Sequence, residues 1–378
     1  MKVMYNVLTL NKIAAVGTKR LGDNYNCGEV ENPDAVLVRS ASMHDMEFAD
    51  NLLAIARAGA GTNNIPKDKC SAQGICVFNT PGANANAVKE LVLTGLLLSS
   101  RKVVEGIEWA KTLKGTGDDM GKLVEKGKGQ FVGPEITGKT LGVVGLGAIG
   151  ILVANVAVAV GMDVIGFDPF LSEANKAKLD PAVQIMGSNE EVMVNCDYLS
   201  IHVPLLPDTK DMVDADMIAK MRDGVRILNY SRDGLVNSDA LLDALKSGKV
   251  AKYVTDFGND KILGEENVIV IPHLGASTPE SEDNCAVMAC NQIKDYIENG
   301  NIVNSVNLPA LSVPRNGSRV TVISKADADV KSVSIAGMTG FNTKTRGEYA
   351  YTIIDGATQE DADKLAAVEG VIKVRFIG

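Results

Sequence analysis

The chain has 378 residues, of which 46% are hydrophobic and 22% are charged, as expected for a globular protein of two or three domains. Its formal net charge is −9 and it has no long basic run, which argues against a nucleic-acid or membrane-surface binder. An N-terminal secretion signal is not evident, and the apolar stretch 87–98 is too short to span a bilayer. Six cysteines without metal-binding spacing predict reduced thiols, no metal site and a cytoplasmic location.

The N-terminal third alternates short apolar strands with helices, the pattern of an α/β fold. The expected elements are a strand over 35–38 that leads into Arg39 and Ser40, an amphipathic helix over 44–58, a strand over 76–78 and a long apolar helix over 84–102. The segment 111–134 is rich in glycine and lysine, which predicts loops around short helical pieces with a solvated charged face.

A glycine-rich turn is the most specific motif of the chain. It has the G-x-G-x-x-G pattern and consists of Gly145, Leu146, Gly147, Ala148, Ile149 and Gly150. A predicted strand over 140–144 precedes it, a helix over 151–160 follows, and the next strand, 162–167, ends in Asp168. The glycines permit a tight turn and close approach of a pyrophosphate to the helix N-terminus. Asp168 suits the ribose hydroxyls and would repel a 2′-phosphate, so the motif predicts NAD rather than NADP.

Strands and helices continue to alternate up to His273, the pattern of a doubly wound parallel sheet. Further strands are expected over 182–186, 197–202, 225–230, 251–257 and 267–271, with a helix over 239–247. Thr278 and Pro279 are expected to open a helix that stops at Gly300. After a linker over 307–317, the terminal block predicts strands over 319–323, 348–354 and 371–377 and a helix over 359–368.

Reactive side chains follow three of the predicted strands, where open parallel sheets bind ligands. These are Arg232, Asp260 and His273. An imidazole can move the hydroxyl proton during hydride transfer, a carboxylate can orient it, and a guanidinium can grip a substrate carboxylate. His202 also ends a strand, so spacing alone leaves both His202 and His273 open as the base, with only a slight preference for His273.

These motifs resemble those of the D-isomer-specific 2-hydroxyacid dehydrogenases, over roughly residues 30–310. The resemblance is carried by Val38-Arg39-Ser40-Ala41, Arg57-Ala58-Gly59-Ala60-Gly61-Thr62, Pro81-Gly82-Ala83-Asn84, the glycine turn, His202-Val203-Pro204-Leu205 and Pro272-His273-Leu274-Gly275-Ala276-Ser277-Thr278. It implies a doubly wound (Rossmann) NAD domain, 98–275, inserted into a smaller flavodoxin-like α/β substrate domain, 1–97 and 276–308, with the active site in the cleft. The terminal block, 317–378, is similar to an α+β ACT-like regulatory domain.

The resemblance also implies a role for individual residues. The expected catalytic residues are Arg232, Asp260 and His273. The expected substrate-binding residues are Arg39, Ser40, Ala60, Gly61, Asn84, Arg232 and His273, with Arg39 and Ser40 near a phosphate. The expected cofactor contacts are Gly145, Gly147, Ala148, Ile149, Gly150, Asp168, His202, Val203, Pro204, Thr209, Ser231, Asp256, Gly275 and Ala276.

The chain departs from the family pattern at three places. Asp260 stands where the family has a glutamate, so its partnership with His273 requires a closer backbone. Asp256 precedes Phe257 by one residue instead of two, and Thr255 occupies the usual aspartate place. The segment 324–334 is short and lacks the Asn-x-Pro-Gly turn of ACT modules, so the first helix of that module is expected to be shortened or absent.

The implied reaction is the NAD-dependent oxidation of 3-phospho-D-glycerate to 3-phosphohydroxypyruvate, by a homodimer or homotetramer without nucleic-acid or membrane partners. One alternative is a glyoxylate or hydroxypyruvate reductase without a phosphate requirement. A distant alternative is an NAD-sensing corepressor-like binding protein.

Overall fold

The computed structural model describes residues 4–378, which divide into two compact units. One unit consists of the chain up to Asn84 together with Thr278–Gly378, and the other is Ala85–Ser277. The helix α3 (Ala85–Ser100) belongs to the second unit, so the division falls before this helix. No helix among residues 4–378 combines the length and the apolarity that a membrane span needs.

The first unit is built on a five-stranded parallel sheet with the order β2-β1-β3-β4-β5. This is the flavodoxin-like order that we expected for the substrate domain. Its elements are β1 (Tyr5–Leu10), α1 (Ala15–Thr18), β2 (Tyr25–Gly28), β3 (Ala35–Val38), β4 (Ala54–Arg57), α2 (Lys67–Ala72), β5 (Cys76–Phe78) and α11 (Pro279–Asn299). The helix α11 begins at the Thr278 cap and ends at Gly300 in the left-handed region, as predicted. It packs against β4 and α1.

The prediction of a helix over 44–58 is wrong. Residues 44–53 form turns and irregular chain, and β4 (Ala54–Arg57) completes the stretch. Ala54, Ile55 and Ala56 are fully buried between β3 and β5, so burial on both faces of the sheet outweighs the helical spacing of the preceding residues. The strands β1 and β2 were also not predicted.

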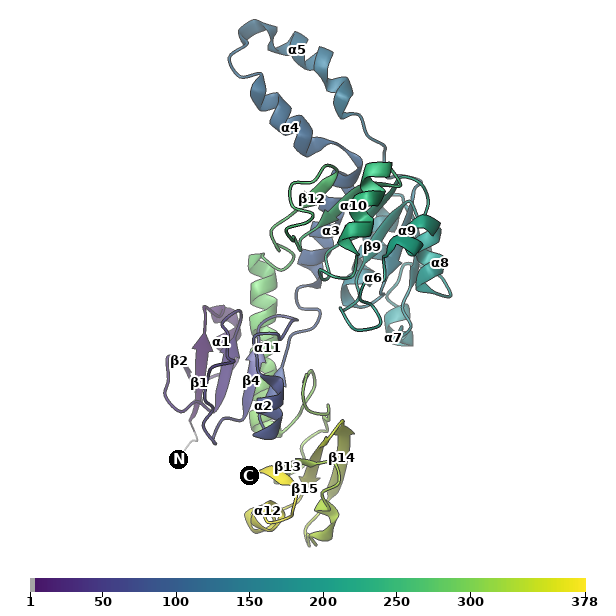
Figure 1. The fold of residues 1–378 in the computed structure, drawn as a ribbon. Coiled ribbons are helices and arrows are strands. Elements are labelled where there is room, and N and C mark those ends of the chain that lie inside the picture. The colour runs from purple at the N-terminus through teal and green to yellow at the C-terminus, as the bar shows by residue number, and fades with distance from the viewer. Residues whose placement is uncertain (1–3) are drawn as a thin grey trace. The chain divides into compact units, whose positions relative to one another are not determined.

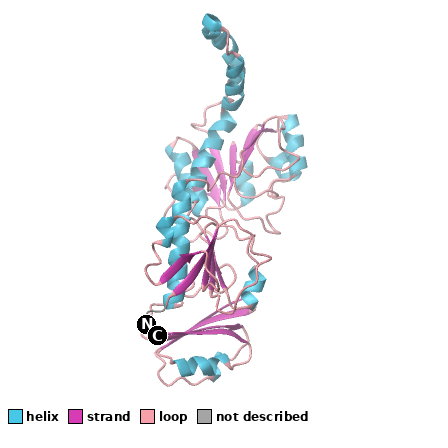
Figure 2. Ribbon diagram, turned by 90° about the vertical axis from the view of Figure 1, so that its left-hand side faces the viewer, coloured by secondary structure: helices cyan, strands magenta, loops and turns pink. Residues whose placement is uncertain are grey.

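A four-stranded antiparallel sheet with the order β14-β15-β13-β16 forms the terminal part of the first unit. Its elements are β13 (Arg319–Lys325), the 3-10 turn η3 (Val330–Ser332), β14 (Gly340–Arg346), β15 (Tyr349–Asp355), α12 (Gln359–Ala366) and β16 (Val371–Ile377). In Figure 2, α12 covers one face of this sheet. The expected loss of the first ACT helix is confirmed, because only η3 stands between β13 and β14.

The opposite face of the terminal sheet joins the core of the parallel sheet. Ile323, Tyr351 and Ile353 pack in one apolar cluster with Tyr296 and Ile297 of α11. Polar contacts strengthen this junction, since the Tyr351 hydroxyl donates to the Gly300 carbonyl and Arg375 donates to the carbonyls of Tyr296 and Ile297. The terminal module is therefore part of the first unit's fold.

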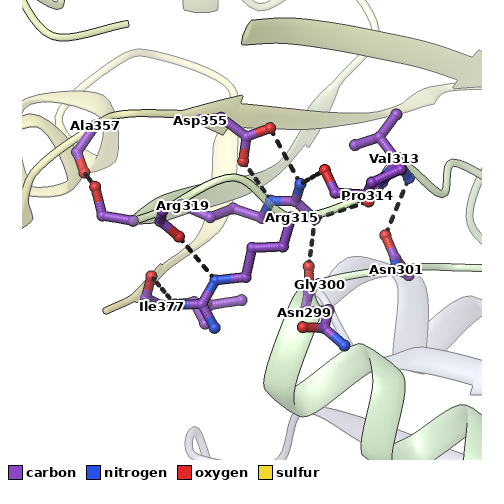
Figure 3. Close-up of polar contacts among 12 residues, drawn as sticks. Asn299, Gly300, Asn301, Val313, Pro314, Arg315, Arg319, Asp355, Ala357 and Ile377 are labelled. Atoms are coloured by element: carbon purple, nitrogen blue, oxygen red, sulfur yellow. Dashed lines mark hydrogen bonds and ion pairs between the residues drawn. The ribbon is translucent and has the colours of Figure 1, made fainter. Parts of the chain in front are cut away.

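A buried arginine fastens the linker to this junction. Arg319 forms a bidentate ion pair with Asp355, at 2.6 and 3.1 Å, and is fully buried. Its remaining N–H groups donate to the carbonyls of Asn299, Val313 and Pro314, at the end of α11 and in the linker (Figure 3). Each guanidinium N–H group therefore has an acceptor.

The second unit is built on a seven-stranded parallel sheet with the order β12-β11-β10-β9-β6-β7-β8. The order reverses between β6 and β9, as in the predicted Rossmann fold. The strands are β6 (Thr140–Val144), β7 (Asp163–Phe167), β8 (Gln184–Ile185), β9 (Tyr198–Ile201), β10 (Val225–Asn229), β11 (Val250–Thr255) and β12 (Val268–Val270). The helices beside them are α6 (Ala148–Ala159), α7 (Glu173–Lys176), α8 (Asn189–Val194), α9 (Ala215–Lys220) and α10 (Ser238–Ser247). The strands expected from sequence are confirmed.

A helical arm projects from the second unit, as Figure 1 shows. It consists of α4 (Val103–Thr112), η1 (Gly117–Asp119), α5 (Met120–Gly127) and η2 (Lys128–Phe131). None of these elements contains a buried residue, although the rings of Trp109 and Phe131 lie 5.3 Å apart inside the arm. Within 111–134, η1, α5 and η2 confirm the short helical pieces predicted for this segment, whereas α4 was not predicted.

Candidate active site

The glycine turn lies between β6 and α6, where the geometry fits a dinucleotide. Gly145 has a φ of +91°, and a Cβ there would come within 2.7 Å of the His202 carbonyl oxygen. A Cβ on Gly147 would meet open space, directly before the first turn of α6. This first turn has no side-chain cap and no acidic residue, so its free N–H groups can donate hydrogen bonds to a phosphate.

Asp168 stands at the end of β7, beside the glycine turn. Its carboxylate accepts hydrogen bonds from the backbone N–H groups of Leu146, at 2.9 Å, and Phe170, at 2.8 Å. The first of these bonds ties the acid to the turn itself. The carboxylate therefore has a fixed place beside the glycine turn that precedes α6, which suits the adenosine ribose.

Neutralising Asp168 is expected to change the preference between the two nicotinamide cofactors. In Asp168→Asn the repulsion of a 2′-phosphate is lost, while the amide oxygen can still accept one backbone hydrogen bond. We expect the ratio of kcat/KM with NADP to that with NAD to rise about tenfold, equivalent to ~1.4 kcal/mol. Steady-state kinetics with both cofactors measure this, and an unchanged ratio would show that Asp168 does not discriminate between them.

His202 follows β9, and its ring is held by the protein. Its Nε2 lies 2.8 Å from the Ser200 hydroxyl, and its backbone N–H donates to the Val144 carbonyl. Burial lowers the pKa of His202 to about 4. The ring is therefore neutral at pH 7, which favours a structural or cofactor-lining role over proton exchange with a substrate.

The depressed pKa of His202 predicts a pH-dependent contribution to stability. Between pH 6.5 and 4 the unfolded state binds a proton that the folded state does not, so stability falls as the pH falls. Going from pH 7 to pH 5 should cost about 2 kcal/mol through this residue. Urea unfolding of the wild type and of His202→Gln at both pH values isolates this contribution. Equal losses in the two proteins would contradict it.

Arg232 follows β10 and is anchored through its backbone. The buried Asn229 side chain donates to the Arg232 carbonyl at 2.8 Å and accepts from the Ser231 N–H. The Ser231 hydroxyl donates to the Ile201 carbonyl, which links the ends of β9 and β10. The Arg232 guanidinium lies 5.6 Å from the centre of the Phe257 ring.

His273 follows β12 in an unusual backbone conformation. Its φ is +25°, a region that side-chain-bearing residues rarely occupy, and its N–H is shared between the carbonyls of Asp256 and Ile271. The exposed imidazole lies against Phe257, with ring centroids 4.6 Å apart. Arg232 and His273 thus meet at the same phenyl ring.

Asp256 is a buried carboxylate on which the charges of both His273 and Arg232 act. It is 4% exposed, and its Oδ1 has no hydrogen-bond partner among the described residues. Burial raises the pKa of Asp256, while the charges of His273 and Arg232 and the N–H of Gly275 act in the opposite direction. A buried acceptor without a partner is costly, so it fits a ligand N–H group such as a nicotinamide carboxamide.

Asp260 is exposed and lies elsewhere in the second unit. It borders a hollow of about 330 Å³ with Asp211, Asp233 and Asp239, beside the start of α10. Within residues 4–378 it forms no hydrogen bond with His273. The structure therefore brings Arg232, Asp256 and His273 together and leaves Asp260 outside this group.

The other expected cofactor contacts lie at the carboxyl ends of the same strands. Val203 and Pro204 follow His202 after β9, and the Thr209 hydroxyl closes their loop by donating to the Pro204 carbonyl at 2.6 Å. Gly275 is buried and Ala276 half-buried in the loop after His273. No group of three or more metal-ligating side chains occurs among the described residues.

The first unit carries its own candidate site at the carboxyl end of its sheet. Arg39 and Ser40 follow β3, and the Asn11 side chain accepts hydrogen bonds from the backbone N–H groups of Arg39, Ser40 and Ala41. The Arg39 guanidinium forms an ion pair of 2.7 Å with Glu282 of α11. Sequence reasoning missed Asn11 and Glu282. The position of Asn11 directly after an apolar run was an available signal, since asparagine tolerates a positive φ, here +72°.

Arg57, Ala60 and Gly61 follow the neighbouring strand β4. Arg57, also missed from sequence, donates through Nε to the Arg39 carbonyl at 3.0 Å, which joins the two loops. The Ala60 carbonyl accepts from the Asn79 side chain at 2.7 Å. Asn84 is half-buried at the end of the unit and contributes no bond to these loops.

Known proteins resemble this chain in both sequence and fold. The model of the D-isomer specific 2-hydroxyacid dehydrogenase NAD-binding domain matches residues 94–275. The D-3-phosphoglycerate dehydrogenase of Mycobacterium leprae is 33% identical, over 97% of this chain and 74% of that protein.

Solved structures show the same similarity. The NAD+-bound 3-phosphoglycerate dehydrogenase of Entamoeba histolytica has a TM-score of 0.63 and 25% identity, over 82% of this chain and 100% of that one. A glyoxylate reductase from Paecilomyes thermophila has a TM-score of 0.66 at 23% identity, over 81% of this chain and 99% of that one, which shows the shared fold alone. By its sequence and its fold, the chain belongs to the D-isomer-specific 2-hydroxyacid dehydrogenases.

Proposed function

We propose that this chain catalyses the NAD-dependent oxidation of 3-phospho-D-glycerate to 3-phosphohydroxypyruvate, the first step of the phosphorylated route to L-serine. The observation that carries the proposal is the similarity to D-3-phosphoglycerate dehydrogenases over 97% of the chain, including the terminal module. The substrate has a phosphate and a carboxylate. The cationic Arg39 guanidinium suits the first, and the Arg232 guanidinium suits the second.

The residues of the second unit fit the cofactor. Gly147 leaves open space for a pyrophosphate at the start of α6, while Gly145 and Gly150 permit the tight turn and its close backbone packing. Asp168 suits the ribose, and the unpartnered Oδ1 of Asp256 suits the carboxamide. Bound NAD supplies the hydride acceptor. The protein contributes binding, orientation and control of one proton.

His273 is the proposed base. Its exposed imidazole accepts the proton of the substrate hydroxyl as the hydride leaves the same carbon, and it returns that proton in the reverse reaction. Arg232 holds the neighbouring carboxylate and the reacting oxygen. The buried carboxylate of Asp256 stabilises the imidazolium electrostatically, a role that the sequence assigned to Asp260.

The substrate proposal is tested by NADH oxidation with phosphohydroxypyruvate, hydroxypyruvate and glyoxylate at equal concentrations. We expect kcat/KM for the phosphorylated acid to exceed the others at least a hundredfold, the range that a lost charged contact of ~3 kcal/mol produces. Arg39→Gln should reduce this preference and leave the rate with glyoxylate unchanged. Equal values for the three acids would instead favour the reductase alternative.

The proposal extends to a homodimer that uses the helical arm. Val103, Val104, Ile107 and Met120 are exposed on α4 and α5, which have no buried residue. Exposed apolar helices of this kind mark interaction surfaces. Light scattering of the wild type and of Ile107→Glu tests the proposed homodimer. A monomeric wild type would contradict it.

A cytoplasmic location completes the proposal. All six cysteines are free thiols, and five of them are buried. Buried unpaired thiols are typical of proteins from reducing compartments.

A further inference from the structure

We infer that Phe257 is a positioning residue that sets the distance and orientation of Arg232 and His273 relative to each other. The inference rests on the proposed function, because it assigns these two side chains to the reaction. The observation is a shared contact. The His273 ring lies 4.6 Å from the Phe257 ring, tilted by 48°, and the Arg232 guanidinium carbon lies 5.6 Å from the same ring.

The interactions are of a kind that fixes geometry. A guanidinium at this distance from a phenyl ring is attracted to the π electrons, and a tilted imidazole packs on the same ring through dispersion. Neither Arg232 nor His273 forms a side-chain ion pair within residues 4–378. To the residues that the structure describes, the Arg232 guanidinium has one hydrogen bond, which it donates to the carbonyl of Ser231. The phenyl ring is therefore the contact that the two groups have in common.

The backbone of Phe257 is rigid enough for this role. Its N–H donates to the Thr255 hydroxyl at 3.0 Å, and that hydroxyl donates to the Asn229 carbonyl at 2.8 Å. Thr255 and Asn229 are paired in the register of β10 and β11 and are almost completely buried. Asn229 also binds the Arg232 carbonyl.

The loop that carries His273 is tied to the same segment. The His273 N–H donates to the Asp256 carbonyl at 3.1 Å, in the residue directly before Phe257. The threonine that replaces an aspartate at position 255 thus has a structural reason. Its hydroxyl connects β10, Phe257 and, through Asn229, the backbone of Arg232. A support of this kind is what keeps reacting groups within a fraction of an ångström of productive geometry.

The experiment compares Phe257→Leu, which removes the ring, with Phe257→Tyr, which keeps it. We measure kcat and KM for phosphohydroxypyruvate, the NADH dissociation constant, and the deuterium isotope effect with 4-deuterated NADH. In Phe257→Leu we expect kcat to fall about thirtyfold or more, the isotope effect to rise, and the NADH dissociation constant to stay within about twofold. Phe257→Tyr should retain at least a third of the wild-type kcat.

Two results would overturn the inference. One is a kcat of Phe257→Leu within about threefold of the wild type. The other is a loss that matches a loss of folded protein, with an unchanged isotope effect, which would mean a purely structural role. If the wild type prefers glyoxylate or hydroxypyruvate, the substrate proposal fails, but the same comparison on that substrate still tests Phe257.

Discussion

Replacing His273 by asparagine is expected to lower kcat by about a thousandfold in both directions of the reaction, since positioned general acid–base catalysis contributes about 10² to 10⁴. Asparagine can still hydrogen-bond the substrate oxygen, and it tolerates the φ of +25° at this position. The loss of kcat would therefore measure the missing proton transfer and not a collapse of the loop that carries residue 273. In the oxidation direction, the pH dependence that the wild type shows in kcat/KM near neutrality should vanish in His273→Asn, because the variant has no base to accept the hydroxyl proton.

His202→Gln is the matched control for this prediction. His202 also follows a strand of the same sheet, but burial lowers its pKa to about 4, so its ring stays neutral and does not change protonation state near pH 7. This variant should keep the wild-type pH profile of kcat/KM. The only change that we expect is in the NADH dissociation constant. A profile that disappears in His202→Gln and persists in His273→Asn would reverse the roles of the two histidines.

Much of the fold could be predicted because its signals are local. Most of the strands from β6 to β12 are short apolar runs, and the helices α7 to α10 each begin at a residue whose side chain caps the first turn. The helix α11 carries Thr278, Pro279 and Gly300 at its two ends, and all three have the predicted geometry. Such signals act within a few residues and survive in any tertiary context.

The predictions that failed concern segments whose secondary structure depends on tertiary contacts and not on local sequence. The stretch 44–58 has helical spacing, but Ala54–Arg57 is needed between β3 and β5, and pairing on both sides outweighs its weak propensity. The strand β14 (Gly340–Arg346) has intermediate and exposed residues only, without a hydrophobic alternation. Its existence depends on its pairing with β15.

The residues of the candidate site also fall into those that local sequence predicts and those that it does not. The glycine turn and Asp168 were predictable, because a strand, a turn and a helix place them by themselves. The partners of Arg39 were not, since Asn11 and Glu282 are distant in sequence and meet it only in the folded unit. The choice between Asp256 and Asp260 likewise depends on how the chain turns after β11, and that turn buries the first and exposes the second.

Replacing Arg319 by methionine is expected to lower the free energy of unfolding by about 3–5 kcal/mol, the cost of leaving one member of a buried ion pair without its partner. Asp355 would keep a charge in a site where its side chain is 9% exposed. The carbonyls of Asn299, Val313 and Pro314 would also lose their donor, at the point where α11 and the linker meet the terminal sheet. Urea denaturation followed by circular dichroism measures the change.

Two further variants distinguish the contribution of the ion pair from the contribution of the hydrogen bonds to backbone carbonyls at this junction. Arg315→Met is the matched control, because Arg315 also donates to backbone carbonyls at this junction but forms no ion pair with a carboxylate side chain within residues 4–378. These carbonyls belong to Glu298, Gly317, Ile377 and Gly378. This control variant should cost about 1 kcal/mol. The double variant Arg319→Met, Asp355→Leu removes both charges and should recover most of the loss. A double variant as unstable as Arg319→Met would show that the carbonyl contacts dominate. In that case the bonds to α11 and the linker, and not the charge pair, hold the terminal module in place.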